Sequence, residues 1–253
     1  MTVTIRRVSP VLLILLLVMS LAGCATTATS LPPEVPAMHS VSELDDELVG
    51  SRDPWIGYNK SMYRFNYNFD KYVFLPVVNT YEFILPTFAQ TGVSNFFNNI
   101  AEIRTLYNSL FQAKGEKALT TTGRFLTNST IGIAGLFDPA TSFGMKRQKE
   151  DFGQTLGVWG VPAGNYFVIP ILGPSTIRDF SGVVVDSGIH YGIKTAINLS
   201  DNVDPGIQAG VTVLKAIDNR HQQPFRYLDS GYPFEYELVR FLYGQAQELQ
   251  VMK

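Results

Sequence analysis

Cys24 is the only cysteine in this chain of 253 residues, and its thiol is the most reactive group that the sequence offers. A single thiol cannot form a disulfide within the chain, but it can act as a nucleophile or as a site of covalent modification. The histidines that could activate a nucleophile are His39, His190 and His221, and no known nucleophile or metal motif accompanies them. We therefore expect no enzyme activity, with a Ser–His hydrolase as the minor alternative.

The residues before Cys24 have the organisation of a signal peptide. Arg6 and Arg7 give a positive start, and residues 11–21 form an apolar run shorter than the roughly 20 residues of a membrane span. The run ends in LAGC, which looks like a bacterial lipobox. The sequence predicts a lipoprotein signal peptide over residues 1–23, with a covalent diacylglycerol and an N-acyl chain on Cys24. A buried cysteine behind an apolar leader is the alternative.

An anchor of this kind is effectively permanent. One acyl chain gives marginal binding, at about 0.8 kcal/mol per buried methylene, and two membrane signals give stable attachment. Ala25 follows the cysteine, where an aspartate would favour retention in the inner membrane by analogy with enteric bacteria. The predicted location is the outer membrane, with the chain lipid-anchored on the side that faces the periplasm.

Net charge and hydrophobicity limit the classes of molecule that the protein is expected to bind. After residues 1–23 are removed, 18 basic and 22 acidic side chains leave a net charge of −4, which argues against nucleic acid as a partner. Only 17% of the residues are charged, against about 25% in a typical soluble domain, while the chain has 17 Phe and 12 Tyr. This composition predicts apolar surface that is covered by lipid or by a partner protein.

The chain is expected to contain a tether and one folded domain. Residues 24–52 are small, polar and proline-rich, apart from a stretch over 41–52 that could form a short acidic helix. The acidic run 45–47 has no further ligands nearby, so we interpret it as a solvated face and predict no metal site. No linker interrupts the pattern after this point, which predicts a single domain over residues 53–250.

The elements of this domain are expected to be helical. Asp53 and Pro54 resemble a helix start, with Asp53 as the N-cap residue. The residues that then recur at helical spacing form one apolar stripe: Tyr58, Met62, Phe65, Phe69 and Tyr72. Aromatic side chains of this helix suit either a core or a membrane interface, and both interpretations are open.

Further helical periods cover residues 93–126, 205–220 and 232–250, and no hairpin signal separates the apolar runs. The predicted fold class is therefore all-α. Four glycines recur at intervals of four, three and four residues: Gly153, Gly157, Gly160 and Gly164. On a helix they would mark a side where a backbone or a lipid chain comes close, and otherwise they belong to turns.

Four ordered blocks of this sequence resemble the MlaA (VacJ) family of outer-membrane lipoproteins. The first is DPWIGYNKSMYRFNYNFDKYVFLPV, in which Lys60 stands where the family pattern Asp-Pro-x-x-x-x-Asn-Arg-x-x-Tyr-x-Phe-Asn has arginine. The others are TTGRFLTNSTIGIAGLFDPAT, EDFGQTLGVWGVPAGNYFVIPILGPSTIRD and DSGYPFEYELVRFLYGQ. The likeness extends over nearly all of residues 53–250 and is weakest at about 180–220.

The resemblance implies a ring-shaped helical protein that lies as a disc in the periplasm-facing leaflet of the outer membrane, around a central amphipathic channel. Such a protein removes mislocalised phospholipids from the outer leaflet and passes them to a soluble periplasmic carrier, in association with a trimeric porin. This task needs no nucleophile, metal or other cofactor. A scaffold lipoprotein of a porin or envelope complex and a membrane-bound lipid hydrolase are the alternatives.

Four residues within these blocks are candidates for lining the channel. Asn66 and Tyr67 belong to the stretch FNYNF and could form or gate its polar wall. Arg178 and Asp179 are charges beside an apolar segment, and such charges should face water or pair with each other. We predict all four in the lipid path, with a structural ion pair between Arg178 and Asp179 as the alternative.

Overall fold

The computed structural model describes residues 52–197, 203–229 and 233–253. Contacts within the chain separate two units, residues 1–35 and 36–253, and every described residue belongs to the second. The predicted signal peptide, Cys24 and the predicted tether with its acidic run, up to residue 51, lie outside the described residues.

The described part of the chain is mostly helical, as predicted. Its elements are α3 (Ile56–Phe69), the π-helix η2 (Asp70–Phe74), α4 (Leu75–Ile84), α5 (Thr87–Phe111), α6 (Gly115–Thr130), α7 (Pro139–Ser142), α8 (Phe152–Val158), β1 (Tyr166–Ile169), β2 (Gly173–Thr176), α9 (Ile177–Ala196), α10 (Pro205–His221) and α11 (Glu235–Met252). The periods that predicted helices over 93–126 and 205–220 correspond to α5, α6 and α10. None of the described helices combines the length and the apolarity that crossing a bilayer demands.

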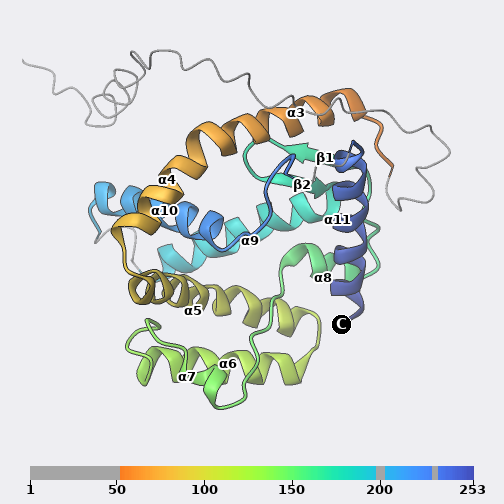
Figure 1. Cartoon of the computed structure of the whole chain (residues 1–253). Helices are drawn as coiled ribbons and strands as arrows, with labels where there is room; N and C mark the ends of the chain where they lie inside the picture. The colour runs from red at the N-terminus through yellow and green to blue at the C-terminus, as the bar shows by residue number, and fades with distance from the viewer. Residues whose placement is uncertain (1–51, 198–202, 230–232) are drawn as a thin grey trace, which may run out of the picture. The chain divides into compact units, whose positions relative to one another are not determined.

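A continuous helical run joins α3, η2 and α4, with the π-helical segment inside it. The run ends because Leu85 takes an extended conformation before Pro86, whose ring disfavours the α conformation in the preceding residue. In Figure 1 the run crosses the top of the view in orange and yellow.

The start of α3 differs from the prediction. Trp55 occupies the N-cap position without a side-chain hydrogen bond, so Asp53 is not the cap. Asp53 is buried, and its carboxylate accepts hydrogen bonds from Asn59 Nδ2 at 2.6 Å and from the Tyr236 hydroxyl. Arg240 Nη1 lies 3.4 Å from the same carboxylate. Asp53 therefore ties the start of the domain to α11.

Residues 166–176 form an antiparallel hairpin, which corrects the prediction that no hairpin is present. Its register places Tyr166 opposite Thr176. Each strand has only four residues and β2 contains a glycine and a proline, so the sequence lacks the alternation that signals a strand. A side chain of α3 completes the pairing of β1, because Asn59 Oδ1 accepts the Val168 N–H at 2.8 Å.

Two glycines bring α8 and α9 into close contact. A Cβ atom at Gly182 would lie 2.1 Å from the backbone nitrogen of Gly153. Gly157 belongs to the same helix as Gly153, whereas Gly160 and Gly164 have positive φ angles of 88° and 74° and lie outside it. The glycine series thus divides into two helical positions and two turn positions.

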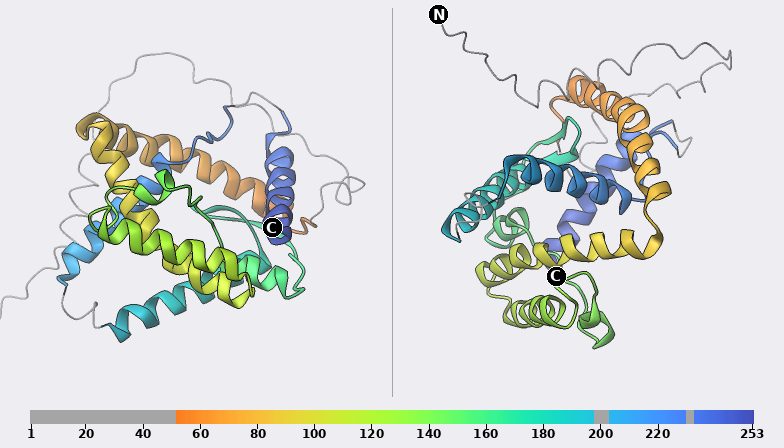
Figure 2. Two further views of the ribbon diagram at one scale, coloured as in Figure 1. Left: turned by 90° about the horizontal axis from the view of Figure 1, so that it is seen from below. Right: turned by 90° about the vertical axis from the view of Figure 1, so that its left-hand side faces the viewer.

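Packing contacts link the described elements in a closed sequence. α3 contacts β1, which pairs with β2; β2 contacts α11, α11 contacts α8, α8 contacts α5, α5 contacts α10, and α10 contacts α4. α9 packs on α8 and β2, while α6 packs along α5 and carries α7. Figures 1 and 2 show the α3–α4 run and the α5–α6 pair on opposite sides, with α10 between them.

Candidate functional site

The run of α3 and η2 buries its polar face. Three members of the predicted apolar stripe, Tyr58, Phe65 and Tyr72, are exposed, and Tyr72 reaches 67%. The buried positions of the run are Asn59, Tyr63, Asn66 and Asp70. Core packing is therefore excluded for the three exposed aromatic side chains.

The same pattern, with polar side chains buried and apolar side chains exposed, extends over the described residues. Twenty-four polar or charged residues are buried, against nine hydrophobic ones, while 40 large hydrophobic side chains are exposed. A water-soluble domain sorts its residues the other way, because burying a polar group costs free energy unless it is paired. An exposed apolar surface of this extent marks a region that lipid or protein covers.

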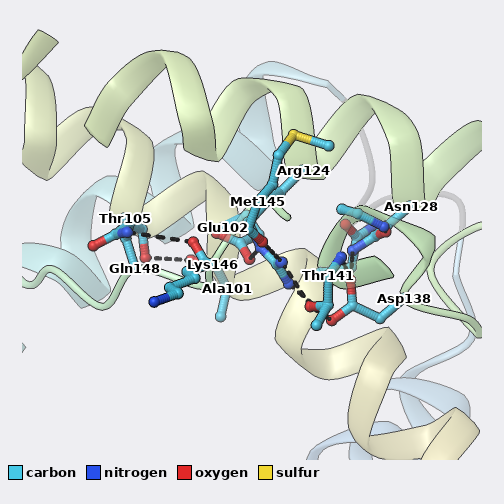
Figure 3. A network of polar contacts seen from close by, with 12 residues as sticks. Ala101, Glu102, Thr105, Arg124, Asn128, Asp138, Thr141, Met145, Lys146 and Gln148 are labelled. Carbon is cyan, nitrogen blue, oxygen red and sulfur yellow. Dashed lines mark hydrogen bonds and ion pairs between the residues drawn. The ribbon is translucent and has the colours of Figure 1, made fainter. Parts of the chain in front are cut away.

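Arg124 joins α5, α6 and the segment around α7 in one polar network (Figure 3). It is 2% exposed, and its Nε donates to Glu102 Oε1 at 2.9 Å while Nη2 donates to Asp138 Oδ2 at 3.0 Å. Nη1 donates to Thr141 Oγ1 at 3.0 Å and to the Met145 carbonyl oxygen at 2.5 Å. All three guanidinium nitrogens have partners, as a buried charge requires.

The two carboxylates that bind Arg124 have different electrostatics. Burial raises the pKa of Glu102, although the charge and hydrogen bond of Arg124 oppose the rise. Burial also acts to raise the pKa of Asp138, but hydrogen bonds from Thr141, Arg124 and Asn128 outweigh it and lower that pKa to about 2. Asp138 is therefore the carboxylate that the network holds most firmly in its ionised form.

Replacing Asp138 by asparagine is expected to lower the free energy of unfolding by about 1–3 kcal/mol at neutral pH, because a charged acceptor is lost. A carboxyl group with a folded pKa below its ordinary value of 3.8 stabilises the fold above that pH and loses this contribution as the pH falls to about 2. Denaturant unfolding over this acid range measures the effect. The wild type should lose stability more steeply than Asp138→Asn, and equal slopes would contradict the assignment.

Asn66 connects α3 to the turn of the hairpin. Its Nδ2 donates to the Ile169 carbonyl oxygen at 3.0 Å, and its Oδ1 accepts the Ile171 N–H at 2.6 Å. Tyr67 is half-buried, and Lys71 Nζ donates to its hydroxyl at 3.1 Å. The contacts give Asn66 a structural task, and a place for Asn66 or Tyr67 in a lipid path stays a prediction.

Arg178 and Asp179 pair with each other at the start of α9. Arg178 Nε donates to Asp179 Oδ1 at 3.1 Å, and the Tyr243 hydroxyl of α11 donates to Asp179 Oδ2 at 2.7 Å. Arg178 Nη2 is buried and has no hydrogen-bond partner among the residues that the structure describes. This geometry matches the alternative of a structural ion pair, and the lipid-path role of both residues stays a prediction.

The other residues considered for chemistry are scattered. Cys24 and His39 lie outside the described residues. His221 Nδ1 lies 2.6 Å from Glu82 Oε1, and His190 is exposed on α9. Within the described ranges no group of three or more His, Cys, Asp or Glu side chains is placed to hold a metal ion. The candidate site is therefore the polar interior itself.

Sequence reasoning missed most of the buried polar residues. Those on α5 and α6 include Asn99, Glu102, Thr105, Asn108, Thr121, Arg124 and Asn128. A signal was present, because on α6 the buried polar residues recur at intervals of three and four. A solvated outer face has the same period, so the spacing alone does not say which way such a stripe faces.

Known proteins resemble this chain over most of its described part. A family model described as MlaA lipoprotein matches residues 51–250. The intermembrane phospholipid transport system lipoprotein MlaA of Haemophilus influenzae is 31% identical over 188 residues, 73% of this chain and 69% of that protein. The protein of the same name in Escherichia coli is 35% identical over 170 residues, 66% of this chain and 61% of that protein.

Length and structure add to these comparisons. The chain spans about half the length of a Rickettsia prowazekii protein, 34% identical over 133 residues, which are 53% of each chain. A chain solved for work on the structural basis for maintenance of bacterial outer membrane lipid asymmetry is 29% identical, with a TM-score of 0.62. The match covers 79% of this chain and 99% of that one. Together with the polar interior and the apolar surface, these matches show that the chain belongs to the MlaA lipoprotein family.

Proposed function

We propose that this chain is an outer-membrane lipoprotein that removes mislocalised phospholipids from the outer leaflet and passes them to a periplasmic carrier. The observation that carries the proposal is the inversion of the fold, with polar residues inside and large apolar side chains outside. Relatives named as intermembrane phospholipid transport lipoproteins support the same role. The proposal places the acyl chains of Cys24 and the helical unit in the periplasm-facing leaflet.

The proposal includes a channel enclosed by the helices. The closed sequence of packing contacts from α3 through β1, β2, α11, α8, α5, α10 and α4 supports a ring. Polar side chains along such a channel would suit a charged headgroup, because such a group is costly to place in hydrocarbon. Outward-facing apolar side chains suit acyl chains of the surrounding leaflet.

Transfer of this kind needs a matched environment and no chemical step. A phospholipid carries two acyl chains, and exposing both to water costs roughly 20 kcal/mol at about 0.8 kcal/mol per methylene. A protein that shelters the tails and solvates the headgroup removes most of this barrier. The proposal therefore assigns no catalytic residue and no cofactor beyond the acyl chains on Cys24. Association with a trimeric porin and delivery to a soluble carrier rest on the family resemblance.

The test measures outer-leaflet phospholipid in cells that lack the chromosomal copy and carry a plasmid-borne one. A membrane-impermeant amine-reactive label should react with several-fold more phospholipid in cells without the protein than in cells with the wild type. Arg178→Ala and Asp179→Ala should each raise the labelled fraction towards the level of cells without the protein. Equal labelling with and without the protein would refute the proposal.

Two control variants test whether an effect is specific to Arg178, and an assay with purified protein tests for hydrolysis. Arg64→Ala removes an exposed arginine of α3 and should leave the labelled fraction unchanged. Arg178→Lys keeps a positive charge and tests whether the charge itself is needed, at equal protein level in the membrane. If purified protein releases lysophospholipid or free fatty acid from vesicles, the hydrolase alternative replaces transport.

A further inference from the structure

Basic side chains from three helices converge on one region of the described structure. They are Arg104 on α5, His190 and Lys194 on α9, and Lys215 on α10. The buried residues of α9 are Arg178, Gly182 and Asp186, at intervals of four. The same interval continues to His190 and Lys194, so both follow the face of α9 that packs against its neighbours.

Hydrogen bonds fix the other two helices against this face. The Tyr107 hydroxyl and Asn108 Nδ2 on α5 donate to Asp186 Oδ1 at 2.8 Å and 3.0 Å. Arg104 lies one turn before this pair on the same side of α5, three and four residues away. This spacing places Arg104 on the side of α5 that faces α9.

Lys215 reaches the region from α10. Ser94 Oγ on α5 donates to Asp218 Oδ1 on α10 at 2.5 Å, which holds the two helices together. Lys215 precedes Asp218 by three residues and so shares the face of α10 that is turned to α5. The charges of Arg104 and Lys194 act on Lys215, and those of Lys194 and Lys215 act on His190, so the four side chains share one region. We name this set the basic cluster.

No carboxylate among the described residues forms a hydrogen bond or an ion pair with a side chain of the basic cluster. None of its four side chains forms a hydrogen bond or an ion pair there, and all are at least partly open to solvent. Asp186 is already used by the Tyr107 hydroxyl, Asn108 Nδ2 and the Phe152 N–H. Asp151 interacts electrostatically with Arg104 across a longer distance than an ion pair, whereas the charges that act on Lys215 are those of Arg104 and Lys194.

The electrostatics of the basic cluster agree with this geometry. Desolvation lowers the pKa of Lys215, and the charges of Arg104 and Lys194 lower it further. Desolvation also lowers the pKa of His190, with added effects of Lys194 and Lys215. Solvent-accessible cations that are partly desolvated and repel one another favour the binding of an anion between them.

We propose that Arg104, Lys194 and Lys215, with His190 as a further hydrogen-bond donor, bind the phosphodiester group of a phospholipid headgroup. The inference deepens the proposed function and rests on it. Lysine and arginine donate charge-assisted hydrogen bonds to phosphate oxygens. Exposed apolar side chains on α9 and α10, Val183, Val184, Val211 and Val213, offer the acyl tails an apolar surface on two of the helices that carry the cluster.

The experiment compares two lipids that differ in the phosphate alone. Purified acylated protein in a neutral, phosphate-free detergent is titrated with a fluorescent short-chain phosphatidylglycerol and with the matching diacylglycerol. The wild type should bind phosphatidylglycerol at least about tenfold more tightly. The double variant Lys194→Gln/Lys215→Gln should lose about tenfold or more of this affinity and bind diacylglycerol unchanged. Lys146→Gln, at an exposed lysine without a described ion pair, should behave as the wild type.

The outcomes separate this inference from the proposed function. If the wild type binds neither lipid, the proposed function fails. If the wild type binds both lipids without a preference for phosphatidylglycerol, and the double variant does the same, the inference alone fails. A third arm adds inorganic phosphate: tight binding that phosphatidylglycerol does not displace would assign the basic cluster to a free anion and overturn the headgroup assignment.

Discussion

Replacing Arg124 by methionine is expected to lower the free energy of unfolding by about 3–5 kcal/mol. The side chain is almost fully buried, and its guanidinium binds Glu102 and Asp138 together with Thr141 Oγ1 and the Met145 carbonyl oxygen. Methionine fills most of the volume but leaves Glu102 buried without its counter-ion. Denaturant unfolding in detergent micelles, followed by near-UV circular dichroism, measures the loss.

The origin of this loss can be tested with a second substitution. Glu102→Leu in the Arg124→Met background removes the unpaired carboxylate, so the double variant should recover most of the stability that the single variant loses. Arg64→Met removes an exposed arginine of α3 and should cost less than about 1 kcal/mol. A loss of that size for Arg124→Met would show that the network does not hold α5 and α6 together.

Local periodicity predicted most of the helices. A helix is specified by residues three and four positions apart, so its pattern can be read from the sequence alone. The apolar and aromatic residues between 93 and 126 recur at helical spacing, and α5 and α6 form there. The proline at 205 and the charged end at 220 likewise delimit α10 to within one residue. The resemblance of four ordered blocks identified the family for a similar reason, since each block is a local pattern.

The direction in which each helix faces could not be predicted in the same way. In α3 the stripe through Tyr58 and Phe65 and the stripe through Asn59 and Asn66 have the same period, and the structure buries the second. In water the apolar stripe would be buried, whereas an apolar solvent favours the reverse. The sequence contains both stripes, and their common period does not say which one is buried.

Features that depend on distant partners were also missed. Asp53 looked like a helix cap, but its partners Tyr236 and Arg240 lie more than 180 residues away and bury it. The hairpin formed without a strand signal because Asn59 and Asn66 of α3 hydrogen-bond to its backbone. Two polar side chains of α3 thus hold the hairpin in place, and the local pattern of either segment does not reveal this contact.

A chain without its acyl anchor is expected to bind neutral vesicles, and Phe83→Glu/Phe88→Glu is expected to weaken this binding by at least about 100-fold. Phe83 and Phe88 are 90% and 80% exposed at the turn between α4 and α5. Moving one phenylalanine from water into an apolar phase gains about 1.5–3 kcal/mol, so losing two removes about 3–6 kcal/mol of binding free energy. Flotation of the mature chain with Cys24→Ser on phosphatidylcholine vesicles measures the partition coefficient.

The control is a double variant that adds the same charge to the same two helices but removes no phenylalanine. Thr80→Glu/Thr87→Glu places two carboxylates at exposed polar positions of the same two helices, so any effect of added charge on folding or on vesicles appears in both double variants. If apolar contact with acyl chains holds the α4–α5 turn in the leaflet, only the phenylalanine variant loses binding. If the unacylated chain ignores vesicles, or both double variants float equally well, the exposed phenylalanines have another cover and the placement of this turn in the membrane is wrong.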